Sequence, residues 1–122
     1  MRTDRERGAA AVEMAIILPV LVALVMGIVE FGRAFNAQQT LTFAAREGVR
    51  AMALENDATT ARTAVRSAGT PLGTIPDSSI TISPTSCTTG TRVTVTVAYQ
   101  LSTTGFFGPI NLSGKGVMLC GG

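Results

Sequence analysis

Few residues of this chain have the types and spacing that chemistry requires. The 122 residues include no His and two Cys, Cys87 and Cys120. Without His there is no Ser-His-Asp triad and no zinc site of mixed Cys and His ligands, and two Cys are too few for a four-thiolate site. Gly105 and Gly108 form no phosphate loop, because both lack a neighbouring lysine in a strand-to-helix context. We therefore predict no catalytic residues, no metal site, no cofactor and no enzyme activity.

Length and charge narrow the class of protein further. A chain of 122 residues forms one small domain at most. The net charge of +2 is far from the concentrated basic surface that neutralises many phosphates, so no nucleic-acid partner is expected.

One acidic residue, Glu13, lies inside an apolar block. Residues 14–29 contain no charged side chain, and extended back to Ala9 the block is 21 residues long. At about 1.5 Å per residue this length crosses a hydrocarbon core of about 30 Å. The segment before it carries three Arg against two acids, which favours a cytoplasmic N-terminus. We expect residues 1–8 to be a cytoplasmic leader, 9–30 to span the membrane and the rest to be extracytoplasmic.

Three interpretations of this segment are open on length and flanks alone. A plain membrane anchor is favoured, because the uninterrupted apolar run of 16 residues is long for a secretory signal. A cleaved signal would use a weak site at residues 32–34 and release a small enzyme or inhibitor cut after Ala34. A pilin-type leader would be cut where the charged segment meets the apolar block.

The residue order at that junction favours the third interpretation. The run RGAAAVE, residues 7–13, places Gly8 at the end of a basic leader and Glu13 at the fifth position after it. This resembles the processing signal of type IV pilins. Over residues 5–54 the chain is similar to the TadE family of pilin-like proteins of tight-adherence pilus systems. The matching features include Leu18-Pro19, EFGRAFNAQQ at 30–39 and AAREGVR at 44–50.

The resemblance implies a structural role with no reaction. A prepilin peptidase would cut between Gly8 and Ala9, and Ala9, Glu13 and Pro19 would act in subunit assembly. Expected partners are other pilin subunits, self or major, joined through the N-terminal helix, together with the membrane, the peptidase and the assembly platform. The chain would lie in the inner membrane and reach a surface pilus, supporting adhesion. Any surface ligand is unidentified, and a minor pilin or pseudopilin is favoured over the main shaft.

Glu13 and Pro19 also have physical consequences of their own. A carboxylate in the bilayer centre costs about 2.5–3.5 kcal/mol on insertion scales, so an intramembrane acid needs a partner. Cleavage would create one, an α-amino group on Ala9; otherwise Glu13 would lie in the headgroup layer. Pro19 cannot donate to the Ala15 carbonyl, so the helix is expected to kink or loosen over residues 15–19.

The rest of the sequence predicts an α+β fold. The helix should continue over residues 31–55 with a stripe of small and apolar residues that packs on the protein's own sheet, on a neighbouring helix, or on both in different stretches. Residues 56–122 are expected to form a small domain. It should hold a helix over 58–68, capped by Asn56 or Asp57 and ended by Gly69, and about three antiparallel strands at 79–83, 92–99 and 115–120. Phe106, Phe107 and Ile110 are predicted to cover the sheet rather than contact a partner.

Cys87 and Cys120 are predicted to form one disulfide. In an extracytoplasmic domain two Cys are more often bonded than free, and no C-x-x-C pair suggests redox chemistry. The main alternative to a pilin is an uncleaved single-pass protein that presents this small disulfide-bonded binding domain outside the membrane.

Overall fold

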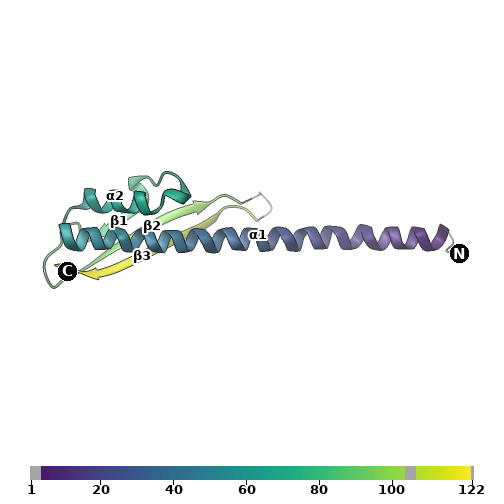
Figure 1. Cartoon of the computed structure of the whole chain (residues 1–122), viewed down its shortest axis with the longest axis horizontal. Coiled ribbons are helices and arrows are strands. Elements are labelled where there is room, and N and C mark those ends of the chain that lie inside the picture. The colour runs from purple at the N-terminus through teal and green to yellow at the C-terminus, as the bar shows by residue number, and fades with distance from the viewer. Residues whose placement is uncertain (1–3, 104–106, 122) are drawn as a thin grey trace. The chain divides into compact units, whose positions relative to one another are not determined.

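The computed structural model describes residues 4–103 and 107–121 and divides the chain into two units, Met1–Arg33 and Ala34–Gly122. We call them the N-terminal unit and the folded unit. The longest helix, α1 (Asp4–Glu55), contributes to both. The folded unit adds α2 (Ala58–Ala68), two 3-10 turns, η1 (Thr70–Leu72) and η2 (Asp77–Ser79), and three strands, β1 (Ile80–Ser83), β2 (Arg92–Leu101) and β3 (Ile110–Leu119) (Figure 1). The predicted α+β fold is confirmed.

The part of α1 in the folded unit packs against the protein's own sheet. Six small or apolar residues of this part are buried and two, Ala34 and Ala51, are half-buried. The buried ones are Ala37, Leu41, Ala44, Ala45, Gly48 and Met52. Their spacing of three and four residues places them on one helix face. For this stretch the structure supports packing on the protein's own sheet.

Helix α2 has the predicted bounds because both ends are capped. The Asp57 carboxylate accepts hydrogen bonds from the Thr60 hydroxyl (3.0 Å) and the Thr59 N–H (2.9 Å), and these bonds lower the pKa of Asp57. At the other end the Gly69 N–H donates to the Val65 carbonyl. Since Ala61 and Val65 are buried, α2 adds its apolar face to the same core.

The sheet has the order β1-β2-β3, and both pairs are antiparallel. Val93, Val95 and Val97 of β2 are buried, while the alternate residues between them are not. The buried face receives both helices, since a Cβ on Gly48 of α1 would meet Val65 of α2 and Val95 of β2. The folded unit is therefore two layers, helices on one face of the sheet and an open second face.

The third strand begins earlier than predicted. Residues 102–114 were expected to form a loop before a strand at 115–120, but β3 starts at Ile110 and pairs from there with Leu101 of β2. The glycines of this stretch hide the strand, because Gly is unfavourable in strands unless another backbone comes close. Ile110 is half-buried, and Phe107 is 48% exposed and is not one of the buried core residues. Phe106 lies outside the described residues.

Two glycines of β3 allow α1 to approach the sheet closely. A Cβ on Gly114 would lie 2.4 Å from the carbonyl carbon and oxygen of Leu41, and one on Gly116 would lie 2.8 Å from the Ala45 oxygen. Both neighbours are helix backbone, which cannot move aside as a flexible side chain can. Any side chain at these positions would therefore push the helix off the sheet.

We expect Gly114→Ala to lower the free energy of unfolding of the folded unit by about 2–4 kcal/mol, because the added methyl group overlaps α1 backbone. Chemical denaturation of the detergent-solubilised chain measures this change. Lys115→Ala is the matched control: its side chain is exposed next to Gly114, so its effect should stay within about 0.5 kcal/mol. Equal effects of the two substitutions would contradict the close approach.

Candidate membrane and assembly segment

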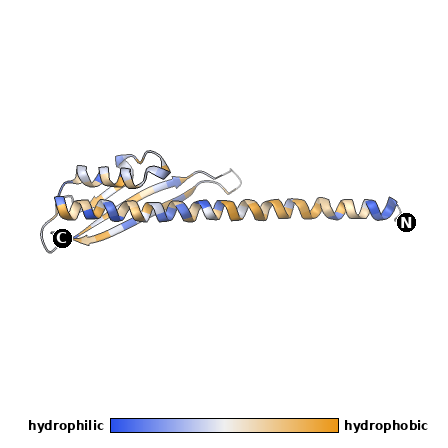
Figure 2. Cartoon of the chain, viewed as in Figure 1, coloured by the Kyte–Doolittle hydropathy of each residue, from blue (hydrophilic) through white to orange (hydrophobic). Residues whose placement is uncertain are grey.

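The N-terminal unit exposes an apolar helix surface. Twelve large apolar side chains between residues 12 and 29 of α1 are 48–69% exposed, and none of its most apolar 18-residue window is buried. Figure 2 shows this continuous hydrophobic stretch in orange. Water solvates such a surface poorly, so this surface is suited to lipid or to contact with other apolar helices.

The length of this stretch matches a bilayer. Within the described part of the chain, α1 is the one helix that is long and apolar enough to cross a membrane. Residues 9–29 span about 30 Å of helix, about the thickness of a hydrocarbon core. Helical backbone satisfies its own hydrogen bonds, as a lipid environment demands.

The residues of the predicted processing site lie in the first turns of α1. Gly8 and Ala9 are helical and exposed, and a Cβ on Gly8 would meet no atom within 4 Å. Packing inside this chain therefore does not require glycine at position 8. Glu13 is exposed and has no ion-pair or hydrogen-bond partner among the described residues. It lies one helix turn after Ala9, as i and i+4 positions do.

Pro19 lies within α1, and the helix continues on both sides of it. Figure 1 shows no sharp bend in this stretch. The missing N–H still leaves the Ala15 carbonyl without its usual helical donor. Any loosening over residues 15–19 is therefore local and does not end the helix.

A second acid, Glu30, closes the apolar run. Its two carboxylate oxygens accept hydrogen bonds from Nη1 of Arg33, both at 3.2 Å. Arg33 and Glu30 thus form an ion pair, in which the Glu30 side chain is only 5% exposed. A buried carboxylate requires such a cation, since burial of an unpaired charge is costly.

The predicted disulfide is confirmed and lies in the folded unit. Cys87 and Cys120 are bonded, with their Cα atoms 5.6 Å apart and a separation of 33 residues in the sequence. Cys120 also donates its N–H to the Thr91 carbonyl at 2.8 Å, and the Gly121 N–H donates to Ala53 of α1 at 3.1 Å. The end of β3 is therefore attached to the β1–β2 loop and to α1.

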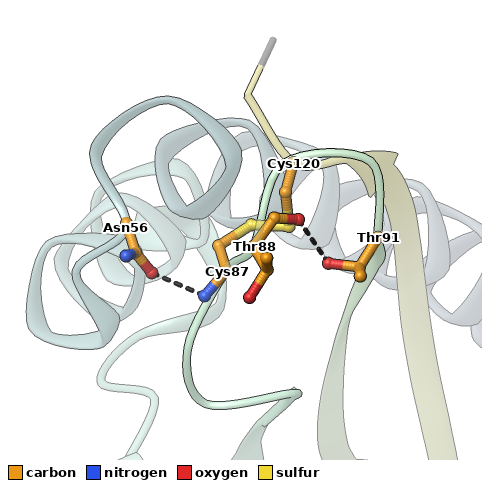
Figure 3. Close-up of a disulfide and its surroundings, with 5 residues drawn as sticks. All are labelled: Asn56, Cys87, Thr88, Thr91 and Cys120. Carbon is orange, nitrogen blue, oxygen red and sulfur yellow. Dashed lines mark hydrogen bonds between the residues drawn. A yellow bond between two sulfur atoms is a disulfide. The ribbon is translucent and has the colours of Figure 1, made fainter.

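Asn56 adds a further contact between α1 and the β1–β2 loop, a role that the sequence did not reveal. Its φ of 50° ends α1 in the left-handed conformation that Asn tolerates. In that position its side-chain oxygen accepts the Cys87 N–H at 2.6 Å, and the Thr91 hydroxyl bonds the Thr88 carbonyl across the same loop (Figure 3). Asn56 was considered only as an N-cap of α2, which Asp57 provides.

The chain combines a helix able to span a membrane with a small disulfide-bonded α+β unit. The family model described as TadE-like protein matches residues 8–50, about a third of the chain. The resemblance seen in the sequence is therefore confirmed, and this segment is TadE-like. The family is structural and non-enzymatic and is associated with tight-adherence pili, which fits a membrane or pilus location. Neither the curated proteins nor the solved structures contain a significant match.

We expect removal of the disulfide, by the double substitution Cys87→Ser and Cys120→Ser, to lower the free energy of unfolding by about 3–4 kcal/mol. The physical reason is the larger conformational freedom of the unfolded chain once the loop is open. Denaturant titration of both chains gives the difference. Reduction of the unsubstituted chain is the control and should produce the same loss; a loss below about 1 kcal/mol in both would contradict the prediction.

Proposed function

We propose that this chain is a minor pilin or pseudopilin of a tight-adherence pilus. It is inserted with its N-terminus in the cytoplasm, cut between Gly8 and Ala9 by a prepilin peptidase, and assembled through its N-terminal helix. Other pilin subunits, the peptidase and the assembly platform are its partners.

The observation that carries the proposal is the apolar surface of α1, which is exposed all round over residues 12–25 and again at Ile28 and Val29. A helix with one apolar face would suit attachment to the protein's own core, whereas this helix suits two environments in turn. Lipid covers it before assembly, and apolar helices of neighbouring subunits cover it in a filament.

Gly8 and Glu13 have separate roles in the proposed movement of the helix from lipid into a filament. Glycine lowers helix stability by about 1 kcal/mol relative to Ala, which eases the local unwinding that a peptidase needs. Cleavage then leaves an ammonium on Ala9, one turn from the Glu13 carboxylate. Pairing of these charges, within a chain or between subunits, lowers the cost of moving the helix out of the membrane interface.

The folded unit favours a minor role. Residues 34–122 form a body much larger than the short major pilins of tight-adherence systems, so these residues suit a tip or initiation position.

The processing step is tested by the intact mass and N-terminal sequence of the protein from membranes and from sheared surface material. We expect a chain that begins at Ala9 in both fractions, and expect Gly8→Ala to retain the leader. Gly32→Ala is the matched control, since its position on α1 is equally open and lies far from the cut. A chain that keeps Met1 and stays in membranes would instead identify an uncleaved anchor, and one that starts near Phe35 would identify a secretory signal.

The assembly step is tested by Glu13→Gln and Pro19→Ala in the same fractions. We expect Glu13→Gln to be cleaved normally and to reduce the protein in the sheared fraction at least tenfold, because the ammonium loses its charged partner. Pro19→Ala, which restores the missing helical N–H, should reduce it less. Glu55→Gln is the control, because Glu55 is an exposed acid in the folded unit, and it should leave the amount of protein in the sheared fraction unchanged. Normal assembly of both variants would exclude an assembly role for these residues.

A further inference from the structure

Strand β2 is longer than the strand that covers one of its edges. The four residues of β1 pair with residues 94–97 of β2, from Ile80 with Val97 to Ser83 with Thr94. Residues 98–101 of β2 pair with β3 alone. Within residues 4–103 and 107–121, therefore, no strand lies beside one edge of β2 over its last four residues.

The hydrogen-bond pattern shows which backbone groups face this open edge. The Cys120 N–H donates to the Thr91 carbonyl one step beyond the strands, so these two groups face each other as they do in a hydrogen-bonded pair. Bonded and non-bonded pairs alternate in antiparallel sheets, which makes Ala98 with Ser113 and Gln100 with Asn111 non-bonded pairs. Ala98 and Gln100 therefore point their N–H and C=O groups away from β3, toward the open edge.

A side-chain contact agrees with this pattern. Nε2 of Gln38 on α1 donates to the Ser113 carbonyl at 2.7 Å. That carbonyl belongs to the non-bonded pair with Ala98, so it points away from β2, as the alternation requires.

The chain before β1 does not fill the open edge. The Ser79 N–H donates to the Pro76 carbonyl at 3.0 Å, and the Ile80 N–H donates to Asp77, so the backbone is folded into the turn η2. An ion pair between Asp77 and Arg66 attaches this turn to α2. A groove of about 380 Å³ remains between residues 74–79 and the end of β2.

The groove is lined only by uncharged residues. Ile75, Tyr99 and Leu112 give it apolar walls, and Thr74, Ser79 and Asn111 are among its polar lining. Ala98 and Gln100 also line the groove, and their backbone N–H and C=O groups point toward the open edge. Such a row of alternating donors and acceptors is matched by another extended backbone.

The other edges of the sheet have different surroundings. Gln38 bonds the Ser113 carbonyl on the outer edge of β3, and α1 backbone lies over the face of this strand at Gly114 and Gly116. The outer edge of β1 is only four residues long and is followed by Pro84, as is common for sheet edges. Residues 98–101 are distinguished by the groove of uncharged residues that lies beside their open edge.

We propose that this edge binds an extended, uncharged peptide segment of another protein, which adds to the sheet as a strand antiparallel to β2. The residues of the segment opposite Ala98 and Gln100 exchange backbone hydrogen bonds with them. The residue between, opposite Tyr99, points to the buried face and contacts the apolar walls, so a small aliphatic side chain fits there. This site belongs to the folded unit alone and does not depend on assembly into a pilus.

The test uses a blocked synthetic peptide, Ser-Ser-Ile-Thr-Ile-Ser, the sequence of residues 78–83, because β2 already accepts this strand beside residues 94–97. It is titrated to about 5 mM into the full-length, isotope-labelled chain in detergent micelles. We expect saturable shifts of the Ala98 and Gln100 amide signals and at least tenfold slower hydrogen exchange of those two amides.

Two N-methylated peptides provide the matched control. Methylation of the Thr and the final Ser removes the N–H groups that would face β2, and should weaken binding at least tenfold. Methylation of the two Ile removes only N–H groups on the far side, and should leave binding within twofold. Equal behaviour of these peptides, shifts elsewhere in the chain, or no saturable shift would overturn the proposal.

Gln100→Pro tests the same edge from the protein side. The N–H that it removes is not used by β3, so the thermal midpoint should change little while peptide binding falls at least tenfold. If this variant does not fold, the methylated peptides still decide the question. Slow exchange of Ala98 and Gln100 that depends on protein concentration, without peptide, would instead identify a second copy of this chain as the occupant and overturn the proposal of a separate partner.

Discussion

The folded unit depends on how closely α1 lies against β3. Gly114 and Gly116 have no side chains, and the backbone of Leu41 and Ala45 takes their place. This contact brings Leu41, Val49 and Met52 down to the valines of β2, and all of these side chains are buried. Gly48 does the same for α2, because Val65 occupies the space above it. Three glycines thus set the spacing of the whole helix layer.

At the end of the folded unit near Cys120, stability depends on cross-links between chain segments. A core built on Ala, Gly and Val is small, and small domains need additional restraints. Four contacts supply them at one place: the disulfide, the Asn56 bond to Cys87, the Cys120 bond to Thr91 and the Gly121 bond to Ala53. Together they join the last turn of α1, the β1–β2 loop and the end of β3, so that none of these ends can separate alone.

Charge distinguishes the two ends of the apolar run of α1. Glu13 is exposed and has no partner in the described residues, whereas Glu30 is buried and bonded by Arg33. The charge of the Glu30 carboxylate is thus paired inside the chain. Glu13 needs a partner outside the folded chain, either water at a membrane interface or the ammonium group that the proposed cleavage would create, and this contrast is why we propose an assembly role for Glu13 and not for Glu30.

The sequence by itself determined the features that depend on local pattern. The apolar run, the α2 bounds set by Asp57 and Gly69, the alternation in β2 and the pairing of the only two Cys follow from composition and spacing, and the TadE-like character follows from the residue order around Gly8 and Glu13. Tertiary structure alone decided the features that depend on residues far apart. From sequence alone Gly114 is predicted to lie in a loop, whereas in the structure α1 backbone occupies the place of its side chain. Asn56 is predicted as a helix cap, whereas it bonds Cys87. The open edge at Gln100 exists because β1 is shorter than β2. These contacts join segments separated by tens of residues, and their geometry is set by packing that no local pattern encodes.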